Sequence, residues 1–192
     1  KYFQQQRLNF LRAVWSKDRD LKAEGFDSDQ PAIRQVLDNS IPKILAAASV
    51  GQLLQGEAEL TKLLYKIAAR TTNYGSFTRE RDSVDVANAL LNHGNYLAYG
   101  LAATTLWVLG IPHGFAVMHG KTRRGALVFD VADLVKDAII LPWAFICAKE
   151  NATEDEFRQQ CLQAFTDHNA LEFMFDQVKY VAAKLDREIN EP

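Results

Sequence analysis

The length, composition and charge of this chain are those of an ordinary globular protein. It has 192 residues, of which 48% are hydrophobic, so it can bury one core and we expect residues 1–192 to form a single domain. The formal net charge of −2 argues against a protein that binds nucleic acid through its overall charge. Any contact with DNA must therefore come from a local basic patch.

The cysteines indicate the cellular compartment, and the start of the chain bears on its domain organisation. Cys147 and Cys161 lie in apolar surroundings and lack the spacing of metal ligands, which is typical of reduced thiols in a cytoplasmic protein. The chain begins at Lys1 rather than at a methionine and passes directly into helix-like sequence. We therefore expect a further domain upstream.

The longest uncharged run, residues 86–120, is long enough to be tested as a membrane span. It contains asparagine, threonine, histidine and proline residues, and this much polarity does not suit a segment facing lipid. We expect a buried central helix instead, and no association with a membrane.

Apolar residues recur at helical spacing along most of the chain, whereas strand-like alternation is scarce. We therefore predict an all-α, multi-helix domain without internal repeats. The predicted helices cover, in chain order, residues 2–24, 31–39, 41–70, 82–109 and 130–148, with one or two more up to about residue 188. The segments best suited to an extended backbone are Phe115 to Met118 and Ala126 to Phe129.

Local signals mark some boundaries of these helices. Pro142 lies inside the helix predicted over 130–148, so we expect a kink or a restart there. Thr153 and Glu156 have the spacing of a capping box, which predicts a helix beginning beside them. Residues 71–81 are polar and predict a loop.

The chemistry is concentrated between residues 110 and 137. His119 lies among glycines that leave the backbone free to form a loop. Asp130 and Asp133 open the next apolar segment, and a spacing of three residues on a helix places both on one face. One imidazole and two carboxylates that face a common point suit a divalent cation such as Mg²⁺ or Mn²⁺.

Basic residues accompany this segment. Lys121, Arg123 and Arg124 lie between the histidine and the aspartates, where they would attract a phosphate group. Arg70 and Arg79, at the loop over 71–81, are further candidates for contact with a phosphate backbone. A solvated loop is the commoner explanation of such residues.

A further carboxylate is expected from the helix over 41–70. Glu59 has Lys62 and Lys66 on its own face, as in ordinary surface pairing, whereas Glu57 has only Thr61 one turn on. Glu57 is therefore the better candidate for an inward carboxylate.

Each of these residues also has an ordinary structural interpretation that involves no catalysis. A single histidine in an apolar loop is usually a packing residue, Asp130 suits a helix cap, and Asp133 suits the first turn of a helix. Their coincidence with a basic cluster favours a site. The chain contains no His-Asp dipeptide, no Glu-x-x-His and no nucleophile elbow, which argues against several other hydrolase classes.

These residues carry a resemblance to a known family. The chain resembles the C-terminal helical, catalytic domain of the CRISPR adaptation integrase, most closely its I-F subtype. The features that match the family are the pair Glu57 and Tyr65, the loop residues Gly110, Pro112, Gly114, Phe115 and His119, the segment from Phe129 to Asp133, and Pro142.

The resemblance implies a set of functional residues. In this family the equivalents of Glu57, His119 and Asp133 bind the catalytic Mg²⁺ or Mn²⁺, and Asp130 lies beside them as a further catalytic residue. Two features depart from the pattern. Ala58 follows Glu57 where many members have glycine, which leaves Glu59 as an alternative, and the spacing from Phe115 to His119 is longer than in many relatives.

The resemblance also implies activity and partners. The family consists of endonucleases that join the 3′ ends of spacer DNA into a CRISPR array by transesterification, with hydrolysis when water attacks. It acts on double-stranded spacer and repeat DNA in the prokaryotic cytoplasm, with a second adaptation subunit that is fused to a helicase-nuclease in subtype I-F. The full-length protein is a homodimer formed through an N-terminal β-sandwich domain, which is absent from this chain.

Two other functions stay open on the residues alone. The first is a helical scaffold or DNA-binding module without catalysis, in which the carboxylates only cap helices; metal binding distinguishes it. The second is a metal-dependent phosphohydrolase for small phosphate esters, which needs a closed pocket instead of an open basic surface.

Overall fold

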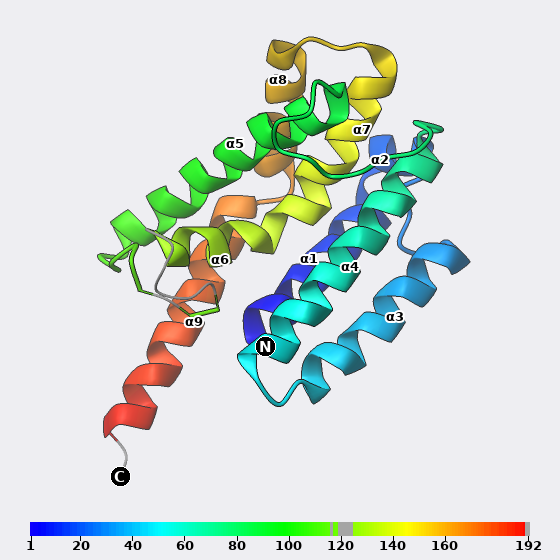
Figure 1. Cartoon of the computed structure of the whole chain (residues 1–192). Coiled ribbons are helices and arrows are strands. Elements are labelled where there is room, and N and C mark those ends of the chain that lie inside the picture. The colour runs from blue at the N-terminus through cyan, green and yellow to red at the C-terminus, as the bar shows by residue number, and fades with distance from the viewer. Residues whose placement is uncertain (116, 119–124, 191–192) are drawn as a thin grey trace.

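The computed structural model describes residues 1–115, 117–118 and 125–190. In this part of the chain every regular element is a helix, which confirms the predicted all-α class. The helices, shown in Figure 1, are α1 (Tyr2–Lys17), α2 (Arg19–Ala23), α3 (Pro31–Ala46), α4 (Val50–Thr71), α5 (Val86–Val108), α6 (Ala126–Val135), the π-helix η1 (Lys136–Ile140), α7 (Leu141–Glu150), α8 (Glu154–Asp167) and α9 (Ala170–Asn190).

The continuous run α6–η1–α7 forms the centre of the molecule, because almost all of its side chains are buried. A helix that is apolar on every side must be covered on every side. Helix α1 covers it through contacts with α6 and η1, and α5 covers it through contacts with α6, η1 and α7. Helices α3 and α4 lie side by side at one edge of the molecule in Figure 1, and α9 extends away from the opposite edge.

Two contacts show how tightly the central run is enclosed. The indole of Trp15 on α1 donates a hydrogen bond of 2.9 Å to the backbone carbonyl of Ala138 in η1. On α5, Gly94 lies so close to Ile140 that an added Cβ atom would meet its Cγ2 at 2.4 Å. The lack of a side chain at Gly94 therefore allows α5 to approach the π-helix closely.

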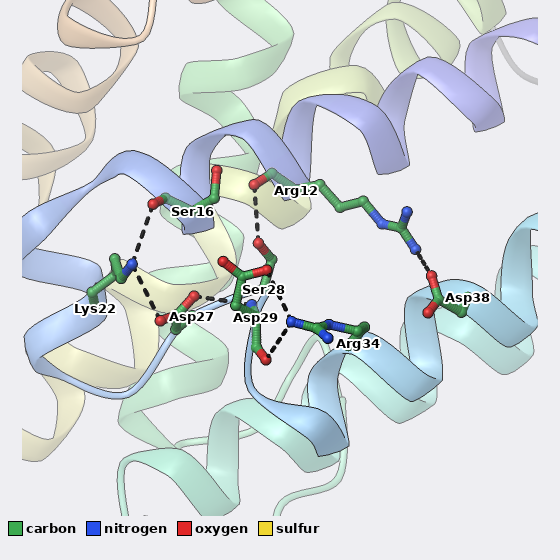
Figure 2. Close-up of polar contacts among 8 residues, drawn as sticks. All are labelled: Arg12, Ser16, Lys22, Asp27, Ser28, Asp29, Arg34 and Asp38. Carbon is green, nitrogen blue, oxygen red and sulfur yellow. Dashed lines mark hydrogen bonds and ion pairs between the residues drawn. The ribbon is translucent and has the colours of Figure 1, made fainter.

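Polar contacts join α1 to α3 on the outer surface (Figure 2). Arg12 forms an ion pair with Asp38, and Ser28 donates a hydrogen bond of 3.2 Å to the backbone carbonyl of Arg12. Arg34 contacts Asp29 at the start of α3. Both side chains of the Arg12–Asp38 pair are well exposed, so this pair contributes little to stability.

The first four helices differ from the prediction in their boundaries. Helix α3 continues through Pro42 to Ala46 instead of ending near residue 39. A proline inside a helix removes one backbone hydrogen bond and crowds the preceding turn, but here the packing of the buried face of α3 outweighs this cost. The break falls at residues 47–49, where Ser49 accepts a hydrogen bond from the backbone N–H of Gln52 and caps α4.

Side-chain caps also explain why two other helix boundaries differ from the predicted ones. The helix predicted over 2–24 is divided at Asp18, whose carboxylate accepts hydrogen bonds from the first amides of α2. The helix predicted from residue 82 begins at Val86, because Asp85 caps it by accepting from the amide of Asn88.

The prediction of an extended segment from Ala126 to Phe129 is wrong. These residues form the first turn of α6, and Asp130 therefore lies inside the helix instead of opening it. A short run that is apolar on all sides has no periodicity to distinguish strand from helix. Phe115, Val117 and Met118 lie outside regular structure, and Ala116 falls outside the described residues.

The remaining predictions for the second half are confirmed. A new helix, α7, begins at Leu141 with Pro142 in its first turn, directly after the π-helix. Thr153 and Glu156 form the predicted capping box at the start of α8. Two helices, α8 and α9, complete the chain. No helix in the described residues combines the length and the hydropathy that crossing a bilayer needs.

Candidate active site

Three of the predicted site residues, Glu57, Asp133 and Arg79, line the same cavity of about 810 Å³. The lining residues come from α4, from the loop that follows it, from α5 and α6, and from the start of η1. The residues that line the cavity are Glu57, Tyr65, Arg79, Arg81, Asp82, Asn92, Asn95, Tyr96, Tyr99, Phe129, Asp133 and Lys136. Folding thus brings together two carboxylates that lie far apart in the sequence.

A smaller pocket of about 110 Å³ adjoins this cavity and shares Glu57 and Asp133 with it. Its lining adds Arg7 from α1 and Asp137 from η1. A π-helical turn widens the backbone locally and is frequent at functional sites. Here the π-helix places Lys136 on both the large cavity and the small pocket, and Asp137 on the small pocket.

The guanidinium of Arg7 is buried among these carboxylates, with the residue only 4% exposed. It forms an ion pair with Glu57, at 3.0 Å between Nη1 and Oε1, and a second one with Asp137 through Nε and Nη2. Nη2 also donates to Thr61 Oγ1 at 2.9 Å, and Nη1 to Gln4 Oε1 at 3.2 Å. All three nitrogens of the guanidinium are therefore hydrogen-bonded.

The charges around Arg7 keep it protonated. Burial by itself lowers the pKa of a guanidinium, but the carboxylates of Asp137, Asp133 and Glu57 outweigh burial and hold the pKa of Arg7 above its ordinary value. Arg7 is therefore a permanent positive charge behind the site.

Asp133 has a cation of its own. The ammonium of Lys136 forms an ion pair with Asp133 and lies 5.3 Å from the centre of the Tyr99 ring. Burial lowers the pKa of Lys136, but the charge of Asp133 and its hydrogen bond to Lys136 more than compensate, so the pKa is raised. Burial also raises the pKa of the Tyr65 phenol, which therefore stays neutral at physiological pH.

Asp130 is nearly fully buried, with an exposed fraction of 3%. Its Oδ2 accepts a hydrogen bond of 3.0 Å from the backbone N–H of Met118. Among the described residues that line the two cavities Asp130 does not appear. It tethers the residue that immediately precedes His119 in the sequence, and so it lies beside the site, not on its wall.

The basic residues separate into three groups. Arg79 lines the large cavity, and its guanidinium is oriented by hydrogen bonds to Asn88 Oδ1 at 2.9 Å and Asn92 Oδ1 at 2.6 Å. Arg70 lines a different surface depression, with Lys66 and Asn73, so it does not share a cavity with the carboxylates. The predicted residues His119, Lys121, Arg123 and Arg124 lie outside the described part of the chain.

Glu59 takes the surface position expected of it. It is exposed on α4, accepts a hydrogen bond from Gln55 at 3.1 Å and lies 4.0 Å from the ammonium of Lys43. The side chain of Glu57, by contrast, is only 15% exposed. The two glutamates of this helix therefore face different surroundings.

The charged residues of this site that sequence reasoning missed include Arg7, Lys136 and Asp137. Lys136 follows Asp133 by three residues on the same helical segment, a spacing that could have suggested their ion pair. Arg7 and Asp137 leave no local signal, because Arg7 reaches the site from a helix that sequence alone describes only as a packing element.

Carboxylate oxygens suit a hard divalent cation, and Glu57 and Asp133 present such oxygens to one cavity. Their donor chemistry therefore fits Mg²⁺ or Mn²⁺. Among residues 1–115, 117–118 and 125–190 no group of three or more histidine, cysteine, aspartate or glutamate side chains has the arrangement of a metal site. The third ligand that the sequence hypothesis names, His119, is not among these residues.

Comparison with known proteins agrees with the resemblance found in the sequence. A family model described as CRISPR associated protein Cas1 matches residues 5–177. A protein of Pseudomonas aeruginosa (strain UCBPP-PA14) named CRISPR-associated endonuclease Cas1 is 50% identical over 186 residues, which cover 96% of this chain and 57% of that protein. The protein of the same name from Pectobacterium atrosepticum is 47% identical over 189 residues, covering 97% of this chain and 58% of the relative.

Solved structures show the same fold. A crystal structure of a TtCas1-DNA complex superposes with a TM-score of 0.63 at 22% identity, covering 90% of this chain and 62% of that one. A crystal structure of TtCas1 superposes with a TM-score of 0.60 at 20% identity, covering 89% and 64% of the two chains. The chain thus spans less than two thirds of the proteins that it matches. With a family match across most of its length and relatives of about half identity, this chain belongs to the Cas1 family of CRISPR-associated proteins.

Proposed function

We propose that this chain carries the catalytic site of a divalent-metal-dependent DNA endonuclease and integrase that inserts spacers into a CRISPR array. The observation that supports it best is the meeting of Glu57 and Asp133 on the wall of one cavity, with Arg79 and Lys136 on the same wall. Carboxylates beside fixed cations are what phosphodiester chemistry requires, because a cation must be held and a phosphate attracted. The two relatives described above are named as endonucleases, which supports the same class of reaction.

Glu57, Asp133 and His119 would hold a Mg²⁺ or Mn²⁺ ion, which when bound supplies Lewis-acid stabilisation of charge on the phosphodiester oxygens. The chain's own residues position the DNA. Arg79, oriented by Asn88 and Asn92, contacts the phosphate backbone without reading sequence, and Lys136 adds a positive charge next to the reacting phosphate. Asp130 acts indirectly, because it tethers the backbone at Met118.

The proposed reaction is transesterification. The 3′-hydroxyl oxygen of a spacer strand forms a new bond to phosphorus in the repeat, and the bond from phosphorus to the existing 3′ oxygen breaks. Attack by water on the same phosphorus gives hydrolysis, and hence endonuclease activity. The DNA complex reported for a structural neighbour supports DNA as the substrate class of the fold.

The wider proposal covers the assembly. Double-stranded spacer and repeat DNA would bind across the cavity, with Lys121, Arg123 and Arg124 as further backbone contacts and Arg70 as a peripheral one. We further propose that the full-length protein is a homodimer, that it acts with the second adaptation subunit, and that it works in the prokaryotic cytoplasm. Residues 1–192 would form the catalytic domain.

Binding of Mn²⁺, measured by calorimetry, together with cleavage of branched DNA tests this proposal. We expect Glu57→Gln, Asp133→Asn and His119→Ala each to lose Mn²⁺ binding and cleavage while the far-UV circular dichroism stays unchanged. Glu59→Gln is the matched control, because Glu59 lies two residues from Glu57 on the same helix but faces solvent. It should bind Mn²⁺ and cleave DNA like the wild type.

Three results would contradict the proposal. Cleavage at the parental rate by Glu57→Gln would show that the cavity does not take part in the reaction. Loss of activity in Glu59→Gln instead would show that the site lies on the outer face of α4. A folded wild-type protein that binds neither Mn²⁺ nor DNA would favour the alternative function, a helical scaffold without catalysis.

A further inference from the structure

The buried guanidinium of Arg7 connects three elements behind the candidate site. It extends from α1, contacts Glu57 and Thr61 on α4, and contacts Asp137 on the π-helix. Gln4, one turn earlier on α1, accepts from Arg7 and donates to the sulfur of Met118 at 3.6 Å. The network thus extends from Glu57 to the segment that precedes His119.

Stability alone does not require such an arrangement. Burying a guanidinium costs free energy that its ion pairs only partly recover, and well-packed apolar residues of similar volume are often as stable or more so. Arg7 is nonetheless almost fully buried, with every guanidinium nitrogen bonded. This geometry is specific for a planar, forked cation, because a lysine ammonium presents its donors from one point.

The guanidinium of Arg7 restricts the orientation of the Glu57 carboxylate. A glutamate side chain has several rotatable bonds, so a carboxylate that must meet a cation in one orientation benefits from a fixed hydrogen bond. Arg7 provides this bond at 3.0 Å, and Thr61 and Asp137 fix the guanidinium in turn. Groups that orient a metal ligand in this way typically affect metal affinity by about 10- to 100-fold when they are changed.

We propose that Arg7 is the positioning residue for Glu57, holding its carboxylate in the orientation in which it takes up a divalent cation. The inference rests on the proposed metal site and adds to it a residue from α1. Arg7 acts through Glu57 and does not itself contact the substrate.

The Arg7→Lys variant tests this role, because it keeps the positive charge and removes the fork. A lysine presents its donors from one nitrogen and cannot occupy the positions of Nε, Nη1 and Nη2 together, so Glu57 becomes freer to rotate. We expect Mn²⁺ affinity, measured by calorimetry, to fall about 10-fold or more. The thermal midpoint, measured in parallel without metal, shows whether the variant is folded.

Arg12→Lys is the matched control. Arg12 lies on the same helix and also pairs with an aspartate, Asp38, but this pair is on the surface that faces α3 (Figure 2). The same substitution there should leave Mn²⁺ affinity unchanged. Thr61→Val is the second variant, since it loosens the guanidinium without any change of charge, and we expect an affinity about 3-fold lower.

The outcomes separate the two proposals. If Glu57→Gln abolishes Mn²⁺ binding while folded Arg7→Lys binds like the wild type, the role of Arg7 is overturned and the metal site stands. If Arg7→Lys does not fold, Thr61→Val decides, and wild-type affinity in that variant overturns the role of Arg7. If the wild type binds no Mn²⁺, both proposals are overturned.

Discussion

Lys136 forms an ion pair with Asp133 at the point where α6 passes into the π-helix. Lys136 retains a partly exposed side chain, with an exposed fraction of 21%, and both residues line the large cavity. Asp133 therefore shares its surroundings with a cation before any metal arrives. A divalent ion and this ammonium would act on the same region, one at the carboxylate and the other at an incoming phosphate.

Lys136→Met is therefore expected to lower the rate of DNA cleavage. Removing one preorganised positive group from a phosphoryl-transfer site costs about 100-fold in rate. Mn²⁺ binding should be retained, because the ammonium competes with the metal for Asp133 and its loss removes a repulsion. Single-turnover cleavage of branched DNA and calorimetry measure the two effects.

Lys62→Met is the control for this prediction. Lys62 lies exposed on α4 outside the large cavity, so its variant should cleave DNA at the wild-type rate. Equal losses in the two variants would mean that bulk charge, not position, accounts for the effect of Lys136. Loss of Mn²⁺ binding in Lys136→Met would show that the lysine supports the carboxylate instead.

The packing of α5 on the π-helix predicts opposite effects for two glycines of one helix. Gly94→Ala forces a methyl group against Ile140 and Phe157, whose nearest atoms lie at 2.4 and 2.9 Å, and should lower the free energy of unfolding by about 1–3 kcal/mol. Gly100 has open space around it, so Gly100→Ala should raise that free energy by about 0.5–1 kcal/mol. Urea unfolding of both variants measures the difference. Equal stability of the two would contradict the close packing.

Stability should also depend on pH through a buried thiol. Burial, with a smaller contribution from Glu150, raises the pKa of Cys147 from its ordinary value of 9.0 to about 11. The folded state therefore prefers the protonated thiol. The contribution of this preference to the free energy of unfolding is complete below pH 9.0 and is lost as pH rises towards about 11. The free energy of unfolding should fall over this interval.

Cys147→Ala isolates this effect from the other groups that titrate at alkaline pH. The variant should lose less stability than the wild type between about pH 8 and pH 10.5, because it lacks the thiol whose ionisation favours unfolding. Urea midpoints at the two pH values provide the comparison. Identical losses would show that Cys147 ionises as easily in the folded protein as in the unfolded chain.

The order of helices along the chain followed largely from the sequence, and the errors have two physical origins. Periodicity identifies an amphipathic helix, as for α4, whereas a run buried on every side has no face to reveal its period, as at Ala126 to Phe129. Boundaries depended on caps such as Asp85 and Ser49, because many residues that can cap a helix also occur in its interior.

Of the candidate site, sequence alone indicated that Glu57, and not Glu59, is the inward glutamate of α4, since the two differ in their neighbours along one helix. Only the tertiary structure decided what these groups face. Arg7, Asp137 and the cavity shared by Glu57 and Asp133 arise from contacts between residues far apart in the chain. Such contacts leave no periodic trace, because a buried charge is defined by the surrounding helices that pair with it and not by its neighbours in sequence.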